Sequence, residues 1–277
     1  MRVFIKIVLA FFAFVFAIGA VQAQTFKYDN AKSYNVGQIR TGAEFHYRPV
    51  KGLSLVVTPE VYLDFYNSSN DQVKVINRIN GSFEIGYKVN RYFKFSAFYT
   101  CLGVYHNAKE GRGVARFWEA KHRVGLNVKG TLPIGRFKLS LREQFRTTFR
   151  PMIYNETYFD YEEKQFAAME LRSRIKLEYD VFSKPVKPFV SVEMANRLNQ
   201  QQYVSKNLLP GDYWLKSMRY RLGVEWRLDK YSSFTFYYEF AHSYNFDVDI
   251  KSEGAIIEID PEVTYSHHIG AYYTLRF

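Results

Sequence analysis

The chain of 277 residues contains a single cysteine, Cys101, and only eight prolines. One cysteine cannot form an internal disulfide, so a disulfide-stapled scaffold is excluded. After residue 23 there is also no long apolar run, so the sequence offers no membrane-spanning helix. Aromatic residues nevertheless make up 18% of the chain, although its mean hydropathy is slightly negative at -0.28. A chain of this kind has one other way to enter lipid, which is a closed β-barrel.

The N-terminus has the features of a secretory signal peptide. Arg2 and Lys6 precede an apolar stretch from Ile7 to Ala20, and Val21-Gln22-Ala23 then supplies small residues at a cleavage position. This order predicts cleavage after Ala23, with residues 1–23 as signal peptide and residues 24–277 as one barrel domain. The apolar stretch is short for the alternative, an uncleaved anchor.

Eleven segments of the mature chain alternate apolar and polar residues with the period of a β-strand. Most of them are longer than the roughly 9–11 residues that a tilted strand needs to cross a bilayer. They are Val36–Tyr47, Leu53–Phe65, Val75–Val89, Tyr92–Tyr105, Ala120–Leu132, Phe137–Phe149, Phe166–Val181, Phe189–Leu198, Leu215–Leu228, Phe234–Tyr244 and Tyr265–Phe277.

Short turns alternate with long connections between these segments. The long ones are predicted at His106–Trp118, Arg150–Gln165, Asn199–Trp214 and Asn245–Thr264. This alternation is typical of an all-β, single antiparallel transmembrane β-barrel with short periplasmic turns and longer extracellular loops. The alternative is a soluble, lipocalin-like barrel in the periplasm.

The strand count raises a difficulty for this interpretation. Eleven up-and-down strands leave the first and the last pointing the same way, and they then cannot close as an antiparallel pair. Single-chain bacterial barrels have even strand numbers. The sequence analysis therefore predicts about 12 strands, with the twelfth in Thr25–Ser33 or Phe246–Pro261, and 10 strands as the alternative.

The last segment ends on an aromatic residue at the C-terminus. In IGAYYTLRF, from Ile269 to Phe277, one face is apolar and the opposite face is small or polar. A final amphipathic strand that ends in Phe resembles the closing strand of bacterial outer-membrane barrels. That resemblance implies that Phe277 is read by the barrel-assembly machinery. An ordinary edge strand of a soluble β protein is the alternative.

The polar faces of the segments carry many charges, which a barrel would direct inward. Bare charges in a narrow lumen are costly unless they are paired or hydrated, so we expect a network of ion pairs that largely closes the lumen. The alternative is a small anion-selective pore lined by the excess of basic residues. The predicted network consists of Arg40, Glu44, Glu60, Arg78, Glu84, Arg123, Arg142, Arg146, Glu170, Arg172, Arg174, Glu193, Arg219, Arg221, Glu225, Glu239 and Arg276.

Two further features belong to the outward faces. Glu143 interrupts the apolar set of Phe137–Phe149, which predicts a bulge or a register shift in that strand. Aromatic residues such as Tyr47, Tyr87, Phe189 and Trp226 gather near strand ends, as in the interfacial girdles of a barrel.

The order and spacing of the strands resemble the Gram-negative outer-membrane barrel family catalogued as domain of unknown function 2490. The residues that carry the resemblance are AEFHYRPVKGLSL, FEIGYKVNRYFKFS, HRVGLNVKGTLPIGRFKLSL, LRSRIKLEY, YRLGVEWRL and the closing GAYYTLRF. The resemblance implies a barrel in the cell outer membrane. It implies no activity, so no functional residues transfer from the family.

Catalysis is the main competing function. Ser243 follows His242, and Ser266 precedes His267 and His268, so these residues could meet at the outer rim as in a lipid hydrolase. Rim histidines and serines are common, and no metal-ligand spacing accompanies them. We therefore expect a non-enzymatic protein without cofactor or metal, with a structural, passive-transport or surface-interaction role.

The basic character of the chain points to a surface partner. The net charge is +11, but the basic residues are scattered over inward strand faces, which does not favour nucleic acid. The phosphates of lipopolysaccharide in the outer membrane are the better match. Arg112, Arg116, Lys121 and Arg123 are the predicted contacts.

Overall fold

The computed structural model describes seven stretches of the chain. The predicted signal peptide, residues 1–23, lies outside the described residues, as do most of the loops predicted at Arg150–Gln165 and Asn199–Trp214. Among the described residues, no helix is long and apolar enough to cross a membrane. The described stretches are residues 31–68, 76–110, 113–149, 167–181, 184–199, 214–250 and 256–277.

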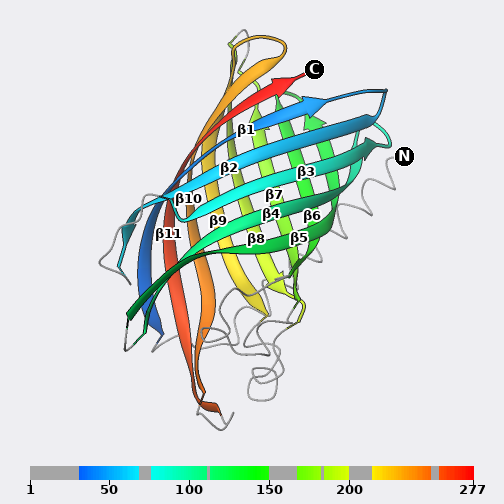
Figure 1. Ribbon diagram of the computed structural model, residues 1–277. Coiled ribbons are helices and arrows are strands. Elements are labelled where there is room, and N and C mark those ends of the chain that lie inside the picture. The colour runs from blue at the N-terminus through cyan, green and yellow to red at the C-terminus, as the bar shows by residue number, and fades with distance from the viewer. Residues whose placement is uncertain are drawn as a thin grey trace.

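The described residues form eleven long strands, and each predicted segment corresponds to one of them (Figure 1). The prediction of a single all-β barrel is therefore confirmed. The strands are β1 Lys32–Tyr47, β2 Leu53–Asn67, β3 Arg78–Lys88, β4 Phe93–Glu110, β5 Gly113–Ile134, β6 Phe137–Phe149, β7 Ala168–Tyr179, β8 Val186–Arg197, β9 Leu215–Arg227, β10 Ser232–Ile250 and β11 Ile256–Arg276.

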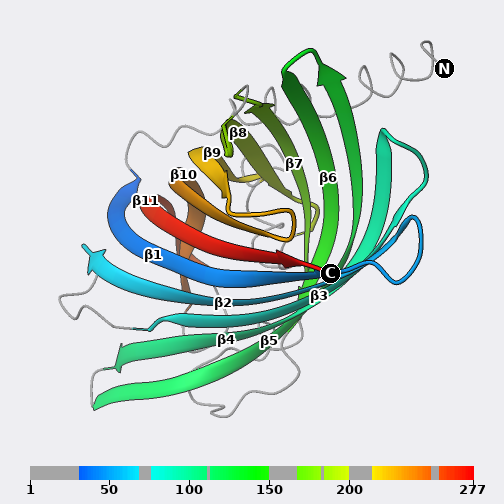
Figure 2. The same cartoon turned by 90° about the horizontal axis from the view of Figure 1, so that it is seen from above.

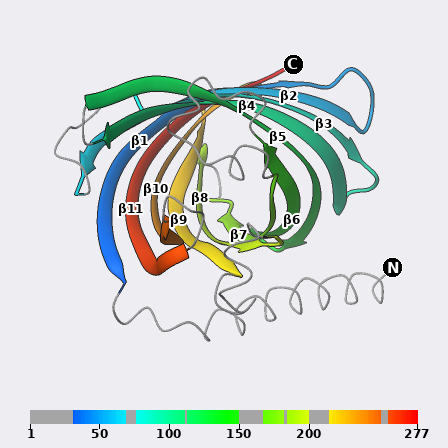
Figure 3. The same cartoon turned by 60° about the horizontal axis from the view of Figure 1, so that its bottom comes forward.

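The strands close into a ring in which each pairs with its sequence neighbours, and β1 pairs with β11 (Figures 2 and 3). All neighbouring pairs are antiparallel except β1–β11, which is parallel over a register that runs from Lys32 opposite Glu262 to His46 opposite Arg276. The N–H of Phe277 then donates to the carbonyl of His46 at 2.8 Å. The C-terminal residue thus ends the closing seam.

The predicted strand number and the all-antiparallel closure need correction. The described residues form eleven strands, and the first and last, which run in the same direction, pair in parallel. The expectation of twelve assumed that a barrel must close antiparallel. A parallel ladder satisfies the backbone N–H and C=O groups of both edge strands as well, so no further strand is needed.

Two of the connections predicted as long loops are strand instead. The β4–β5 ladder continues out to Glu110 opposite Gly113, and the β10–β11 ladder to Ile250 opposite Ile256. Most of Phe246–Pro261, proposed as a twelfth strand, belongs to this second hairpin, which projects at the end opposite to the C-terminus (Figure 1). In this second hairpin apolar and acidic residues still alternate, from Phe246 to Ile250 and from Ile257 to Val263, so the sequence pattern of a strand and the cross-strand hydrogen bonding continue together.

Polar side chains face the inside of the barrel, and large apolar side chains face outward. Arg146, Glu170 and Glu239 are buried, whereas Leu126, Leu222 and Ile269 are each more than half exposed. A water-soluble barrel has the opposite arrangement, with an apolar interior. The outer face therefore matches an apolar surrounding and the inner face a polar one.

Two predictions about single residues are wrong. Glu143 faces outward without any register shift in β6, and it accepts a hydrogen bond from the Ser173 hydroxyl at 2.6 Å. Phe189 belongs to the inner face and is 6% exposed, with the Lys176 ammonium 4.0 Å from its ring centroid. Both misassignments arose because residue type was given more weight than strand parity.

The short turns all lie at one end of the barrel and show ordinary turn chemistry. The Asn90 side chain accepts from the N–H groups of Tyr92 and Phe93 at 2.8 and 3.0 Å. Gly52 and Gly135 have φ angles of 90° and 60°, which other L-residues rarely adopt. These turns hold the register of the hairpins that build the inner face.

Candidate functional site in the barrel lumen

A cavity of about 730 Å³ lies inside the barrel. Among the described residues, ten arginines and four lysines line it, against five glutamates. The lining is therefore strongly basic, and the charges are unevenly distributed around it.

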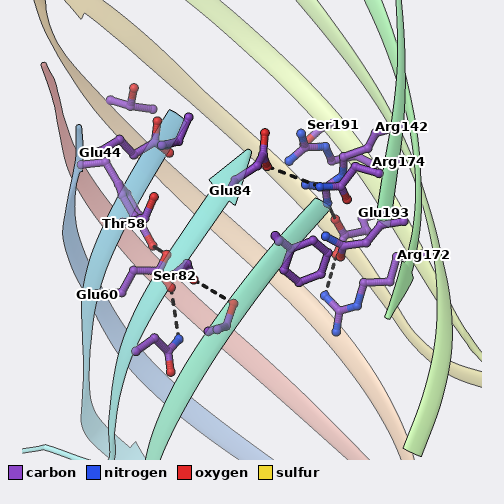
Figure 4. Close-up of a pocket in the computed structure, with 18 of the residues that line it drawn as sticks. Glu44, Thr58, Glu60, Ser82, Glu84, Arg142, Arg172, Arg174, Ser191 and Glu193 are labelled. Atoms are coloured by element: carbon purple, nitrogen blue, oxygen red, sulfur yellow. Dashed lines mark hydrogen bonds and ion pairs between the residues drawn. The ribbon is translucent and has the colours of Figure 1, made fainter. Parts of the chain in front are cut away.

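We call the lining residues of β5–β9 the basic wall and those of β2–β4 the neutral wall. Figure 4 shows the two facing each other, with Arg142, Arg172, Arg174 and Glu193 on one side and Glu60, Ser82 and Glu84 on the other. The basic wall consists of Arg123, Asn127, Lys129, Arg142, Gln144, Arg146, Arg172, Arg174, Lys176, Phe189, Ser191, Glu193, Lys216, Arg219, Arg221 and Glu225. The neutral wall consists of Val56, Thr58, Glu60, Tyr62, Arg78, Asn80, Ser82, Glu84, Lys94, Ser96, Phe98 and Thr100.

Two glutamates hold the centre of the basic wall together. Glu193 accepts from Arg142 Nη2 at 2.6 Å and from Arg172 Nη1 at 2.9 Å. Glu170, which is buried, accepts from Arg146 Nε at 2.7 Å and also pairs with Lys216. Each carboxylate therefore serves two or more cations, so positive charge remains in excess.

Glu239 on β10 organises the edge of this wall toward β1. Its side chain is 2% exposed and accepts from Arg40 Nη1 at 3.0 Å and from Arg221 Nε at 2.9 Å. Arg219 approaches it at 3.9 Å. Such charge-assisted bonds are about twice as strong as neutral ones, and together they fix three arginines from two strands, β1 and β9.

The neutral wall is built from hydrogen bonds to uncharged donors. Glu60 accepts from the hydroxyls of Tyr62 and Tyr272 at 3.1 and 2.5 Å and from Asn80 Nδ2 at 3.1 Å. Glu84 pairs with a single cation, Lys94, at 2.7 Å. This side therefore presents hydroxyl and amide groups without excess charge.

Aromatic rings fill the space over inward glycines where the two walls meet. A Cβ at Gly270 would lie 2.0 Å from the ring of Tyr237, whose neighbour Tyr272 stacks at a centroid distance of 5.9 Å. The ring of Phe98 likewise covers Gly125. The glycines thus let aromatic side chains lie flat against the inner face and leave the centre of the lumen open.

The structure places the predicted lumen residues on the inner face. All of them line the cavity except Glu170 and Glu239, which are buried behind it and pair with arginines that line it. The prediction omitted Lys94, Lys129, Lys176 and Lys216, which also line the cavity. The signal was present for Lys129 and Lys176, which are an even number of residues from Arg123 and Arg174 on their own strands. It was absent for Lys216, which lies beside the register shift between β8 and β9, and for Lys94, because no residue of β4 was in the predicted network.

The proposed rim cluster of serines and histidines is divided by the barrel wall. His267 is exposed and hydrogen-bonded to the Tyr238 hydroxyl at 2.6 Å, whereas the next residue, His268, is buried inside, 3.2 Å from Arg40 Nη2. His242 packs outside against Phe240, and Ser266 lies inside. Within the described part of the chain, no Ser–His hydrogen bond joins them, and no group of three or more His, Cys, Asp or Glu could hold a metal ion.

Two of the predicted lipopolysaccharide contacts need correction. Arg123 lines the cavity and donates to the Thr148 hydroxyl at 2.9 Å, and Lys121, on the same face of β5, pairs with Glu119 at 3.0 Å. Both face inward by strand parity. Arg112 lies outside the described residues, as does the side chain of Arg116.

No protein-family model and no curated protein sequence matches this chain. Solved structures of similar shape include the NanC porin, with a TM-score of 0.42, 8% identity and coverage of 74% of this chain and 85% of that one. The outer-membrane protein OmpT of Vibrio cholerae has a TM-score of 0.41, 13% identity and coverage of 80% and 64%. The beta domain of the Bordetella autotransporter BrkA has a TM-score of 0.41 and 10% identity, with coverage of 82% of this chain and 84% of that one. These similarities are too distant to bear on function.

Proposed function

We propose that the protein is a non-enzymatic β-barrel of the bacterial outer membrane whose lumen admits small anions. The outward apolar and inward polar faces support the location, because a barrel can expose Leu126, Leu222 and Ile269 only to an apolar surrounding. In this orientation the short turns face the periplasm and the β10–β11 hairpin faces outward. The barrel-assembly machinery reads the C-terminal Phe277, and the membrane and its lipopolysaccharide surround the wall.

One observation carries the anion preference: ten arginines and four lysines against five glutamates around a cavity of about 730 Å³. Fixed positive charge along a narrow aqueous path attracts anions and repels cations. The same residues, including Arg142, Arg172 and Glu193, also brace the lumen through their ion pairs. The proposal thus combines the predicted network with the predicted anion-selective pore, and it is consistent with the family of domain of unknown function 2490.

Two experiments test the proposal. Membrane fractionation should recover the protein with the outer membrane, and recovery in the soluble periplasm would contradict the location. In planar bilayers under a potassium chloride gradient, the reversal potential should show chloride passing several-fold faster than potassium. A barrel that gives no conductance, or one that prefers potassium, would rule out the anion pathway.

A further inference from the structure

A row of positive charges crosses four neighbouring strands of the inner face. Lys94 lies opposite Lys129, Lys129 opposite Arg142, and Arg142 opposite Arg174. All four side chains line the cavity. Residues directly opposite each other on antiparallel strands have Cβ atoms about 4.5–5.5 Å apart, and like charges in such pairs are destabilising. The row is therefore expected to lower the stability of the folded barrel.

Carboxylates balance only part of this row. Lys94 pairs with Glu84 at 2.7 Å, and Arg142 with Glu193 at 2.6 Å. Glu193 also serves Arg172 at 2.9 Å, so it is shared. Within the described residues, no carboxylate oxygen lies within 4 Å of Lys129 or Arg174. Arg174 lies opposite Glu193, but Arg142 and Arg172 already share that carboxylate. Among the described residues, two of the four positive charges in the row, those of Lys129 and Arg174, therefore have no ion pair of their own.

Arg142 contributes a hydrogen-bond donor as well as charge. Its Nε is buried and has no partner among the described residues, although its Nη2 is bonded to Glu193. Buried donors are nearly always satisfied, so an unpaired one beside a cavity marks a place for an acceptor. Lys129 and Arg174 stand on either side of Arg142, on strands roughly 4.8 Å apart. A compact group with several oxygens could contact all three.

We propose that Lys129, Arg142 and Arg174 bind a compact dianionic oxyanion of the phosphate type. The two cations without an ion pair of their own, Lys129 and Arg174, set the charge of the ligand. The free Arg142 donor and the guanidinium of Arg174 favour oxygens in a planar or tetrahedral arrangement. The neutral wall opposite presents Glu84 already paired with Lys94 and so does not repel such a ligand. This inference deepens the proposed function and rests on it, since the anion reaches the site through the lumen.

The test uses the full-length mature barrel in planar bilayers at pH 8. Inorganic phosphate should block the chloride current. Glycerol phosphate is tested beside it, to distinguish binding of a phosphate ester carried by a larger solute from binding of the free ion. Lys129→Gln and Arg174→Gln should each raise the half-blocking concentration about tenfold, the effect of losing one charge-assisted contact. The site is supported if either ligand blocks the wild-type current and its half-blocking concentration rises in both variants.

Arg276→Gln is the matched control. It removes one positive charge from the same lining, but Arg276 pairs with Glu225 at 3.2 Å and lies outside the row. Its half-blocking concentration should change less than twofold. If Arg276→Gln raised the half-blocking concentration as much as Lys129→Gln and Arg174→Gln do, phosphate would be responding to the overall charge of the lumen. That result would overturn the site.

A second measurement separates this site from the proposed function. If the barrel conducts nothing, the anion pathway fails, but binding is still measured by thermal unfolding in detergent with phosphate against chloride at equal ionic strength. A rise in Tm with phosphate that is lost in Arg174→Gln and kept in Arg276→Gln supports the site. No difference between the two salts would overturn it. Conductance with anion preference but no block by either phosphate would overturn the site alone.

Discussion

Glu239 and Glu60 are both carboxylates of the inner face, yet their partners differ completely. Glu239 contacts arginines from β1 and β9, whereas Glu60 accepts only from Tyr62, Tyr272 and Asn80. The first holds together repelling cations at the edge of the basic wall, and the second organises neutral donors on the neutral wall. The two walls thus use the same residue type for opposite electrostatic tasks.

The difference shows how a net positive lumen remains stable. Around the basic wall Glu170, Glu193 and Glu239 are each shared among several cations, so removing one of them leaves several charges unpaired. At Glu60 on the neutral wall, loss of the carboxylate leaves only hydroxyl and amide donors, and water in the cavity can accept from these. Stability therefore depends far more on the acidic residues of the basic side than on those of the neutral side.

The largest expected effect comes from Glu239→Gln compared with Glu60→Gln. Glu239→Gln leaves the buried Arg40 and the partly buried Arg221 without their carboxylate and should lower the free energy of unfolding by about 3–5 kcal/mol. Glu60→Gln keeps an amide oxygen as acceptor and should cost about 1 kcal/mol. Urea unfolding of the barrel in lipid vesicles gives both values. Equal losses would remove the distinction between the walls.

The next effect concerns the boundary between the walls. Gly270→Val places atoms where the ring of Tyr237 lies, 2.0 Å from the position of a Cβ. Displacing this ring should cost about 1–3 kcal/mol, as overpacking generally does. Gly81→Ala is the control, because a Cβ at Gly81 meets nothing within 4 Å. Unfolding midpoints that match in the two variants would show that the ring moves without penalty.

The smallest effect lies outside both walls, in the exposed turn between β9 and β10. Hydrogen bonds from the Ser232 hydroxyl and from the N–H groups of Tyr231 and Ser232 hold the pKa of Asp229 below its ordinary value. A depressed pKa in the folded state means that the contribution to stability is present above the unfolded pKa. That contribution is lost as the pH falls through the folded pKa.

An NMR titration of the Asp229 side chain in micelles should therefore give a midpoint below that of a model peptide, and Ser232→Ala should move it upward. Lys230→Gln serves as the control, since the hydrogen bonds and not the neighbouring charge are the main cause. If the titration midpoint of Asp229 moved in Lys230→Gln and not in Ser232→Ala, the charge of Lys230 would be the main cause of the lowered pKa.

Much of this fold could be predicted from alternation alone. The parity of Ile269, Tyr272 and Arg276 placed each on its correct face of β11, because side-chain direction in a strand depends only on position along the chain. The bulge or register shift predicted at Glu143 and the outward position predicted for Phe189 were wrong, because residue type was trusted over parity. The serine and histidine cluster failed for a related reason, since His267 and His268 are neighbours in sequence and therefore point to opposite faces.

The alternation of residue types along the chain was enough to specify long amphipathic strands with polar residues on one face and apolar residues on the other. The tertiary structure alone decided that eleven strands close with β1 parallel to β11 and that Lys129, Arg142 and Arg174 stand in one row. This is because the face of the sheet to which a side chain points is set locally, by its position along its own strand. Register and closure depend on hydrogen bonds between residues far apart in the chain, which no local pattern specifies.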